Sequence, residues 1–111
     1  MKIGERKLYV DLGATHLIAA TKEYQNIAVE IKSFLGKSDV NDLEEAIGQF
    51  FLYYKIIKQR EPNRHLYLAV NETTFNGIFT EEIGQIVLAD PMFRLIIFDE
   101  ENELVSQWIH T

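Results

Sequence analysis

Glu30 and Lys32 are the pair of residues in this chain whose types and spacing best suit catalysis. They close an alternating run at residues 27–32 (Ile-Ala-Val-Glu-Ile-Lys), and successive side chains of a strand point to opposite faces. Both should therefore lie on one face, roughly 6.5–7 Å apart along the strand. In that arrangement Glu30 can bind a divalent cation, and Lys32 can orient a water molecule or neutralise a phosphoryl oxygen.

A second acid, Asp11, ends another strand-like run (Leu-Tyr-Val-Asp, residues 8–11). If a neighbouring strand brings Asp11 beside Glu30, the two carboxylates form an oxygen donor set that suits Mg²⁺ or Mn²⁺. The backbone carbonyl of Ile31 could also reach such an ion. The ion would activate a water molecule and offset charge that develops on a phosphate.

A simpler interpretation accounts for the same residues. Glu30 and Lys32 could be a solvated ion pair, which typically contributes about 0–1 kcal/mol. Asp11 followed by Gly13 is also an ordinary way to end a strand, because Asp and Gly favour turns. Spacing alone leaves both interpretations open.

The order of the expected elements indicates an α/β fold, with a mixed central β-sheet flanked by helices in a single domain over residues 1–111. Alternating or continuous apolar runs predict strands, and these lie at residues 7–12, 16–21, 27–33, 65–70, 94–99 and 104–109. A long helix should begin at Ser38, Asp39 or Asn41 and end near Pro62, since the residue before a proline disfavours helix. A second helix, interrupted by Gly77 and Gly84, is expected over residues 74–88.

The long helix should present Gln49 on the same face as Glu45 and Tyr53, one turn away on either side. Its predicted apolar stripe consists of Val40, Leu43, Ile47, Phe50, Phe51, Tyr54 and Ile57. Gly48 would let this helix approach the sheet closely. Gln49 would then either face the Asp11, Glu30 and Lys32 cluster or remain a surface glutamine.

Composition and charge limit the classes of function. The chain has no cysteine, which excludes disulfides and thiolate metal sites and favours a cytoplasmic setting. It has no apolar run long enough to span a membrane. Its net charge is −6, which argues against nonspecific DNA binding, because phosphate contacts supply most of that affinity. The acidic excess lies in residues 61–111, with nine Asp or Glu against two Lys or Arg.

Several segments resemble the XisH-type proteins, which are named for the controlling factor of fdxN element excision in heterocyst-forming cyanobacteria. The similarity covers nearly the whole chain, and its most specific blocks are Val-Glu-Ile-Lys-Ser-Phe and Ala-Ile-Gly-Gln. The matching segments are Gly-Glu-Arg-Lys-Leu-Tyr-Val-Asp-Leu-Gly-Ala (4–14), Ile-Ala-Val-Glu-Ile-Lys-Ser-Phe (27–34), Asp-Leu-Glu-Glu-Ala-Ile-Gly-Gln-Phe-Phe-Leu-Tyr (42–53), Leu-Tyr-Leu-Ala-Val (66–70) and Leu-Ile-Ile-Phe-Asp (95–99).

The resemblance implies a PD-(D/E)XK restriction-endonuclease-like fold and a role in programmed DNA rearrangement. In sites of that kind an acid, a Glu-x-Lys and a helical glutamine follow in this order. By that analogy Asp11 and Glu30 would bind the metal, Lys32 would be the motif lysine, and Gln49 would face them. An XisI-like protein or a recombinase is implied as a partner.

In one respect the chain departs from the family pattern. XisH-type chains usually have a helical segment before the Gly-Glu-Arg-Lys block, and here that block begins at Gly4. Without that helix we expect an exposed apolar groove on the sheet, which a homodimer could fill.

Three functions are compatible with the sequence. The first is a Mg²⁺-dependent endonuclease acting on DNA through Asp11, Glu30, Lys32 and Gln49. The second is a non-catalytic regulator of a site-specific recombinase that binds a protein partner through its acidic carboxyl half. The third is a structural oligomer in which Glu30 and Lys32 form only an ion pair.

Overall fold

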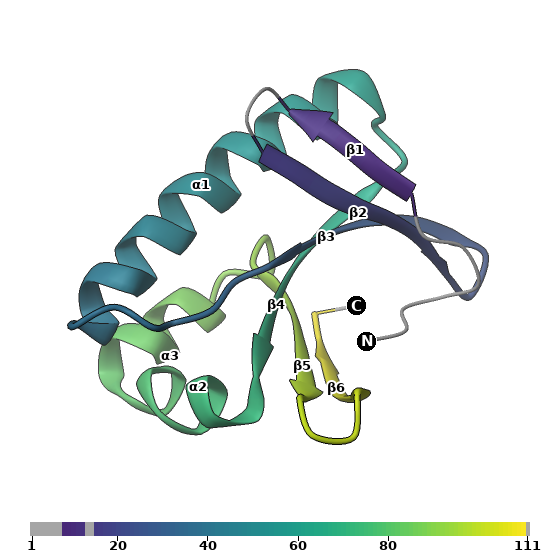
Figure 1. Cartoon of the computed structure of the whole chain (residues 1–111). Coiled ribbons are helices and arrows are strands. Elements are labelled where there is room, and N and C mark those ends of the chain that lie inside the picture. The colour runs from purple at the N-terminus through teal and green to yellow at the C-terminus, as the bar shows by residue number, and fades with distance from the viewer. Residues whose placement is uncertain (1–7, 13–14, 111) are drawn as a thin grey trace.

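Six strands form one mixed sheet in which the order across the sheet is the order along the chain (Figure 1). The computed structural model describes the backbone of residues 8–12 and 15–110 and the side chains of residues 17–110. The strands are β1 (Leu8–Leu12), β2 (Thr15–Lys22), β3 (Gln25–Ile31), β4 (His65–Asn71), β5 (Arg94–Asp99) and β6 (Leu104–Ile109). β1, β2 and β3 form an antiparallel meander, β3, β4 and β5 are parallel, and β6 pairs antiparallel with β5. The predicted mixed α/β sheet is confirmed.

Helices connect the parallel strands, as a crossover between parallel strands requires. α1 (Asp39–Arg60) joins β3 to β4, while α2 (Glu72–Asn76), a 3₁₀ turn η1 (Ile78–Thr80) and α3 (Glu82–Leu88) join β4 to β5. Side chains of α1, η1 and α3 share one core cluster with the sheet, so the described helices cover one face of it (Figure 1). No helix in the described part of the chain is long and apolar enough to cross a membrane.

Local hydrogen bonds determine where α1 begins. The Ser38 hydroxyl accepts a hydrogen bond of 3.2 Å from the Asn41 backbone N–H, which satisfies one of the unpaired donors of the first turn. The Asp42 carboxylate accepts one of 2.9 Å from the Gly36 N–H, closing the loop that precedes the helix. Of the three predicted caps, the structure uses Ser38. α1 ends at Arg60, two residues before Pro62, as predicted.

The buried face of α1 differs from the predicted stripe. Leu43, Ala46, Phe50, Tyr53 and Ile57 are buried, whereas Phe51 is 49% exposed. Alternating spacings of three and four keep the buried residues on one narrow stripe. The predicted stripe shared Leu43, Phe50 and Ile57 with it but omitted Ala46 and Tyr53.

The predicted role of Gly48 is also wrong. A side chain built at Gly48 would meet no atom within 4 Å, so this glycine faces away from the sheet. The close approach of helix and sheet occurs at Ala46, which is fully buried.

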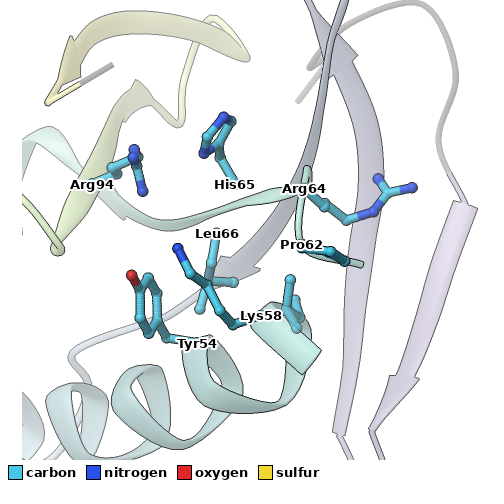
Figure 2. A pocket seen from close by; sticks show the side chains of 8 residues that line it. Tyr54, Lys58, Pro62, Arg64, His65, Leu66 and Arg94 are labelled. Carbon is cyan, nitrogen blue, oxygen red and sulfur yellow. The ribbon is translucent and has the colours of Figure 1, made fainter. Parts of the chain in front are cut away.

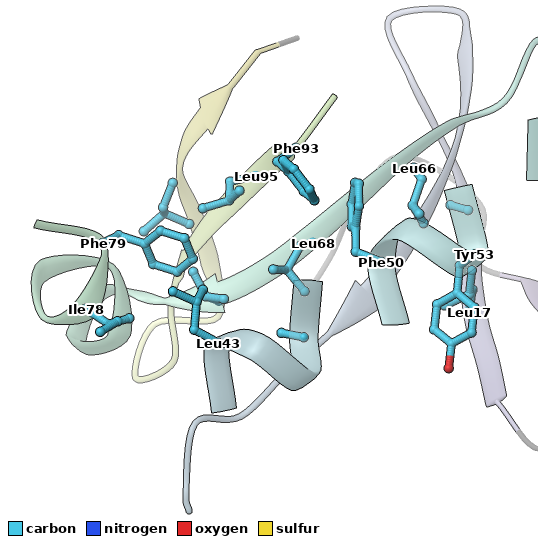
Figure 3. Close-up of a cluster of buried hydrophobic side chains, with 14 of the residues drawn as sticks. Leu17, Leu43, Phe50, Tyr53, Leu66, Leu68, Ile78, Phe79, Phe93 and Leu95 are labelled. Atoms are coloured by element: carbon cyan, nitrogen blue, oxygen red, sulfur yellow. The ribbon is translucent and has the colours of Figure 1, made fainter. Parts of the chain in front are cut away.

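The main core lies between α1 and the sheet (Figure 3). Leu43 and Phe50 of α1 pack over Leu68 of β4, and the ring of Phe50 lies 5.2 Å from that of Phe93, at an interplanar angle of 42°. The continuous apolar run of β4 is explained because both faces of this strand are buried.

The face of the sheet that carries no described helix is closed by the curl of the sheet itself. Lys22 of β2 lies 4.7 Å from the ring centre of Trp108 on β6, and Trp108 meets Tyr67 edge-on at 5.3 Å. Ile27, Tyr67 and Ile96 on this face are fully buried. For the described residues, the expected exposed apolar groove is therefore wrong.

The single helix predicted over residues 74–88 is two short helices with a 3₁₀ turn between them. Gly77 caps α2, and Gly84 lies inside α3 instead of interrupting it. A methyl group at Gly84 would lie 2.3 Å from the carbonyl oxygen of Ile78 and 2.5 Å from the Cα of Phe79. The absence of a side chain at residue 84 is what lets α3 pack directly on η1.

Gly84→Ala should therefore destabilise the protein by about 2 kcal/mol, because the new methyl group overlaps backbone atoms that cannot move aside easily. Gly48→Ala is the matched control: the site is open, and alanine in a helix interior should stabilise by about 0.5–1 kcal/mol. Urea unfolding followed by circular dichroism measures both. A change of the same sign in the two variants would contradict the packing described for Gly84.

Candidate functional site

The carboxyl end of β3 carries the predicted pair. Ala28 belongs to the core under α1, whereas Ile27 and Val29 belong to the core on the opposite face, so the side chains of β3 alternate as predicted. Parallel pairing with β4 continues one residue beyond the strand, where the Lys32 N–H donates a 3.0 Å hydrogen bond to the Ala69 carbonyl. The backbone that carries Glu30 and Lys32 is therefore held by the sheet.

Two side chains of α1 hold the ammonium group of Lys32. Lys32 Nζ lies 2.9 Å from Glu45 Oε1, in an ion pair, and donates a 3.3 Å hydrogen bond to Gln49 Oε1. Glu45 and Gln49 are one turn apart and so share a helix face. The structure thus places Gln49 against Lys32 rather than on an isolated surface. Glu45 has no predicted role in the site, although its position four residues before Gln49 was the available signal.

Glu30 is the buried acid of this site. The residue is 8% exposed, and every other buried side chain in the described part of the chain is hydrophobic. Its Oε1 atom is buried and has no hydrogen-bond partner in the described structure. Burial raises the pKa of its carboxyl from 4.5 to about 7, and the nearby Lys32 ammonium only partly offsets that rise. Near neutral pH the carboxyl is therefore poised between its protonated and ionised forms.

Asp11 is placed by its backbone alone, because its side chain lies outside the described residues. In the β1–β2 pairing its Cα lies opposite that of His16, and Ile18, two residues further along β2, lies opposite Val29 of β3. Asp11 therefore lies at the same end of the sheet as Glu30, with β2 between their strands. Its predicted approach to Glu30 stays a prediction, and so does the metal contact of the Ile31 carbonyl.

The chemistry of these residues fits a divalent cation. A buried carboxylate oxygen without a donor is an uncommon and unfavourable state, and a cation bound to it would remove that penalty. Within residues 17–110, no three His, Cys, Asp or Glu side chains come together as a ready-made metal site. Among the described residues Glu30 is the buried acid of this site, and Asp11 would have to supply the second carboxylate.

Comparison with known proteins adds the family. The model of the XisH protein family matches residues 1–106. The chain belongs to the XisH family. No match was found among curated proteins.

Two solved structures are similar to this XisH-family chain. One is an XisH family protein from Nostoc punctiforme PCC 73102, with 38% sequence identity, a TM-score of 0.80, and coverage of 92% of this chain and 82% of that one. The other is a fdxN element excision controlling factor protein from Anabaena variabilis, with 36% identity, a TM-score of 0.79, and coverage of 92% and 81%.

The raised pKa of Glu30 predicts how stability depends on pH when no metal is bound. Between pH 4.5 and about 7 the unfolded carboxyl ionises while the folded one stays protonated, so the free energy of unfolding should fall as pH rises. The loss should total about 3 kcal/mol and level off above pH 7. Glu30→Gln cannot ionise and should lack this loss.

Urea unfolding of both proteins in EDTA from pH 4.5 to 8 measures the difference. Glu44→Gln, which removes an exposed acid of α1, is the control and should follow the wild-type curve. Parallel pH curves for Glu30→Gln and the wild type would show that Glu30 ionises normally in the folded protein.

Proposed function

We propose that this XisH-family protein acts in the programmed excision of a DNA element, and that its site cleaves phosphodiester bonds with a divalent metal. The observation that carries the proposal is the buried, unpartnered carboxylate of Glu30 beside a lysine that α1 holds in place. A fold alone does not confer an activity. The role in excision is supported by the relative from Anabaena variabilis, which is described as a fdxN element excision controlling factor.

Glu30 and Asp11 would hold Mg²⁺ or Mn²⁺, together with the Ile31 carbonyl. When bound, the ion supplies a water molecule of lowered pKa and neutralises charge on the phosphate. Because Glu30 is about half protonated near pH 7 in the absence of metal, cation binding should release its proton. The affinity for the cation should therefore rise with pH until Glu30 is fully ionised.

Lys32 would contact the phosphate group that is attacked. Its ammonium is already desolvated on one side, with 20% of the side chain exposed, and Glu45 is 58% exposed. An incoming phosphate can therefore compete with the solvated Glu45 carboxylate for Lys32, while Gln49 keeps the ammonium in position. Gln49 is in this sense a positioning residue, and Glu45 holds Lys32 when no substrate is present.

The first test needs no substrate. Mn²⁺ or Mg²⁺ should raise the melting temperature of the wild type, since a ligand that binds only the folded state adds about 2.7 kcal/mol at a hundred times its Kd. Glu30→Gln and Asp11→Asn should abolish the increase, whereas Glu44→Gln should keep it. An equal increase in the wild type and in Glu30→Gln would place the ion elsewhere.

The second test follows nicking of supercoiled plasmid DNA in the presence of Mn²⁺. Glu30→Gln and Lys32→Met should lower the rate by on the order of 100-fold or more, because each removes a group that acts on the reacting atoms. Gln49→Leu should lower it by about tenfold, as expected when a supporting residue is lost. A rate that survives Glu30→Gln would assign the cleavage to a contaminant or to another site.

A non-catalytic regulator is the second candidate, and the acidic turn after β5 favours it. Asp99 accepts a hydrogen bond of 2.7 Å from the Asn102 side chain, which is the largest cause of its lowered pKa, and the backbone N–H groups of Asn102 and Glu101 donate to it at 3.2 and 3.0 Å. Glu100, Glu101 and Glu103 around it are exposed. The turn is thus an ordered, anionic surface that could bind a recombinase or an XisI-like protein.

In this second case, Glu100→Lys, Glu101→Lys and Glu103→Lys should each weaken binding to an XisI-type partner because they reverse the charge of the surface, and Glu30→Gln should leave it unchanged. Co-purification of the tagged partner with each variant measures the effect. If binding is lost in Glu30→Gln and kept in the three charge reversals, the regulatory proposal is wrong.

A further inference from the structure

A basic pocket lies at the end of the sheet opposite to Lys32. β4 begins at His65, which pairs with Ile27 near the start of β3, so the pocket is at the amino ends of the parallel strands and beside the last turns of α1. Its volume is about 370 Å³ when the open solvent at its mouth is included. Its polar lining consists of Tyr54, Lys58, Arg64, His65 and Arg94 (Figure 2).

The pocket is positively charged, although the part of the chain that supplies two of its cations is acidic. Residues 61–111 contain nine acidic residues and only two basic ones, Arg64 and Arg94. Both of these line the pocket, and no Asp or Glu does. In a chain with a net charge of −6, such a concentration of cations is not explained by average composition.

The cationic groups differ in how they are held. Arg64 donates hydrogen bonds to Glu61, at 3.0 Å, and to the Ile27 carbonyl, at 2.8 Å, and its guanidinium points away from the others (Figure 2). Lys58 and Arg94 have no ion pair with any described residue. Lys58 lies over the ring of Tyr54, 5.5 Å from its centre. Two uncompensated cations and a phenol therefore border the same space.

The pKa of His65 indicates that the electrostatic potential in the pocket is positive. Burial lowers the pKa of its imidazole, and Arg94 and then Lys58 lower it further. Glu61, the nearest acid in this loop, is engaged by Arg64 and does not offset these two cations. The charged form of the imidazole is therefore disfavoured, and an anion between the two cations would favour it.

The dipole of α1 explains only part of this arrangement. Lys58 and Arg60 lie in the last turn, where cations are stabilised by the partial negative charge of the helix end. Arg94, however, comes from β5 and is not part of that turn. An anion that contacts both Lys58 and Arg94 must therefore lie in the pocket between them.

We propose that this pocket binds a phosphate group, with Lys58 and Arg94 as the charged contacts and the Tyr54 hydroxyl and His65 as hydrogen-bond partners. The phosphate can come from a free phosphate ion or from the backbone of a nucleic acid, and the chemistry is the same for both. This site is separate from Glu30 and does not depend on catalysis there.

The ring protons of His65 provide the measurement. The chain has three histidines, so their resonances can be resolved by NMR and His65 assigned with His65→Gln. Inorganic phosphate is titrated in EDTA, at constant ionic strength with chloride as the reference anion, and a 12-base-pair duplex DNA is titrated separately. Phosphate should shift the His65 signal in a saturable way and raise the pKa of its imidazole.

Lys58→Gln and Arg94→Gln should each weaken the apparent affinity at least fivefold. Lys55→Gln should change it less than twofold, since Lys55 lies on the same helix but outside this pocket. Lys58 is exposed, so its variant should fold even if Arg94→Gln does not. Saturation by inorganic phosphate indicates a free phosphate ligand, and a shift with duplex alone indicates backbone phosphate; either result supports the site.

The proposal is overturned if neither titrant gives a saturable shift, or if Lys55→Gln weakens binding as much as Lys58→Gln. Repeating the titration in the Glu30→Gln variant separates this inference from the proposed cleavage. Phosphate binding should be unchanged there even though metal binding is lost.

Discussion

The packing of α1 against β3 and β4 is the interaction on which the rest of the structure depends. The helix lies on the sheet through a narrow stripe centred on Ala46 and Phe50, both fully buried. This close contact covers the face of β3 that carries Glu30 and brings Glu45 and Gln49 within hydrogen-bond distance of Lys32. The same burial that stabilises the fold therefore removes water from the carboxyl group of Glu30. The core and the candidate site therefore depend on each other, because α1 contributes side chains to both.

Burying Glu30 works against stability. A carboxylate without a hydrogen-bond donor loses its hydration and gains little in return, which is why its pKa rises to about 7. A chain selected for stability alone would place an apolar residue or a glutamine with partners at this position. The Lys32 ammonium is nearby but is held by Glu45 and Gln49, so it does not neutralise Glu30 fully. Acids with pKa values perturbed by burial are frequent at functional sites.

Much of the fold could be predicted from sequence because local signals agreed with tertiary packing. The bounds of β5 and β6 match the predicted ranges, since each strand is a distinct apolar or alternating run between polar turns. The alternation of β3 was predictable for the same reason. What failed depended on three-dimensional contacts: the burial of Tyr53 instead of Tyr54, and the packing of Gly84 on η1. The curl that buries Tyr67 and Ile96 leaves no periodic signal in the chain.

The candidate site was predictable to a similar extent. Strand alternation put Glu30 and Lys32 on one face, and helix periodicity put Glu45 and Gln49 on one face, because both rules are local. They left open whether Gln49 faces Lys32, which the structure answers with a hydrogen bond of 3.3 Å. They could not show that Glu30 loses its water or that Glu45 joins the cluster, since these depend on how closely α1 lies on the sheet. The basic pocket was not foreseen at all. Arg64 and Arg94 are 30 residues apart, and only the parallel pairing of β4 with β5 brings them to one end of the sheet.

The direction of the parallel strands explains how a protein of net charge −6 can present surfaces of both signs. Acids gather at the carboxyl ends of the strands, at Glu30 and in the turn after β5, while Arg64, His65 and Arg94 lie at the amino ends. α1 runs back between these ends, so its negative terminus lies beside the cations, where the helix dipole stabilises them. A polyanion would therefore be repelled at the Glu30 end unless a metal ion neutralised that end, and attracted at the other. Binding and chemistry would then be governed separately, the first by fixed cations and the second by a cation that must be recruited.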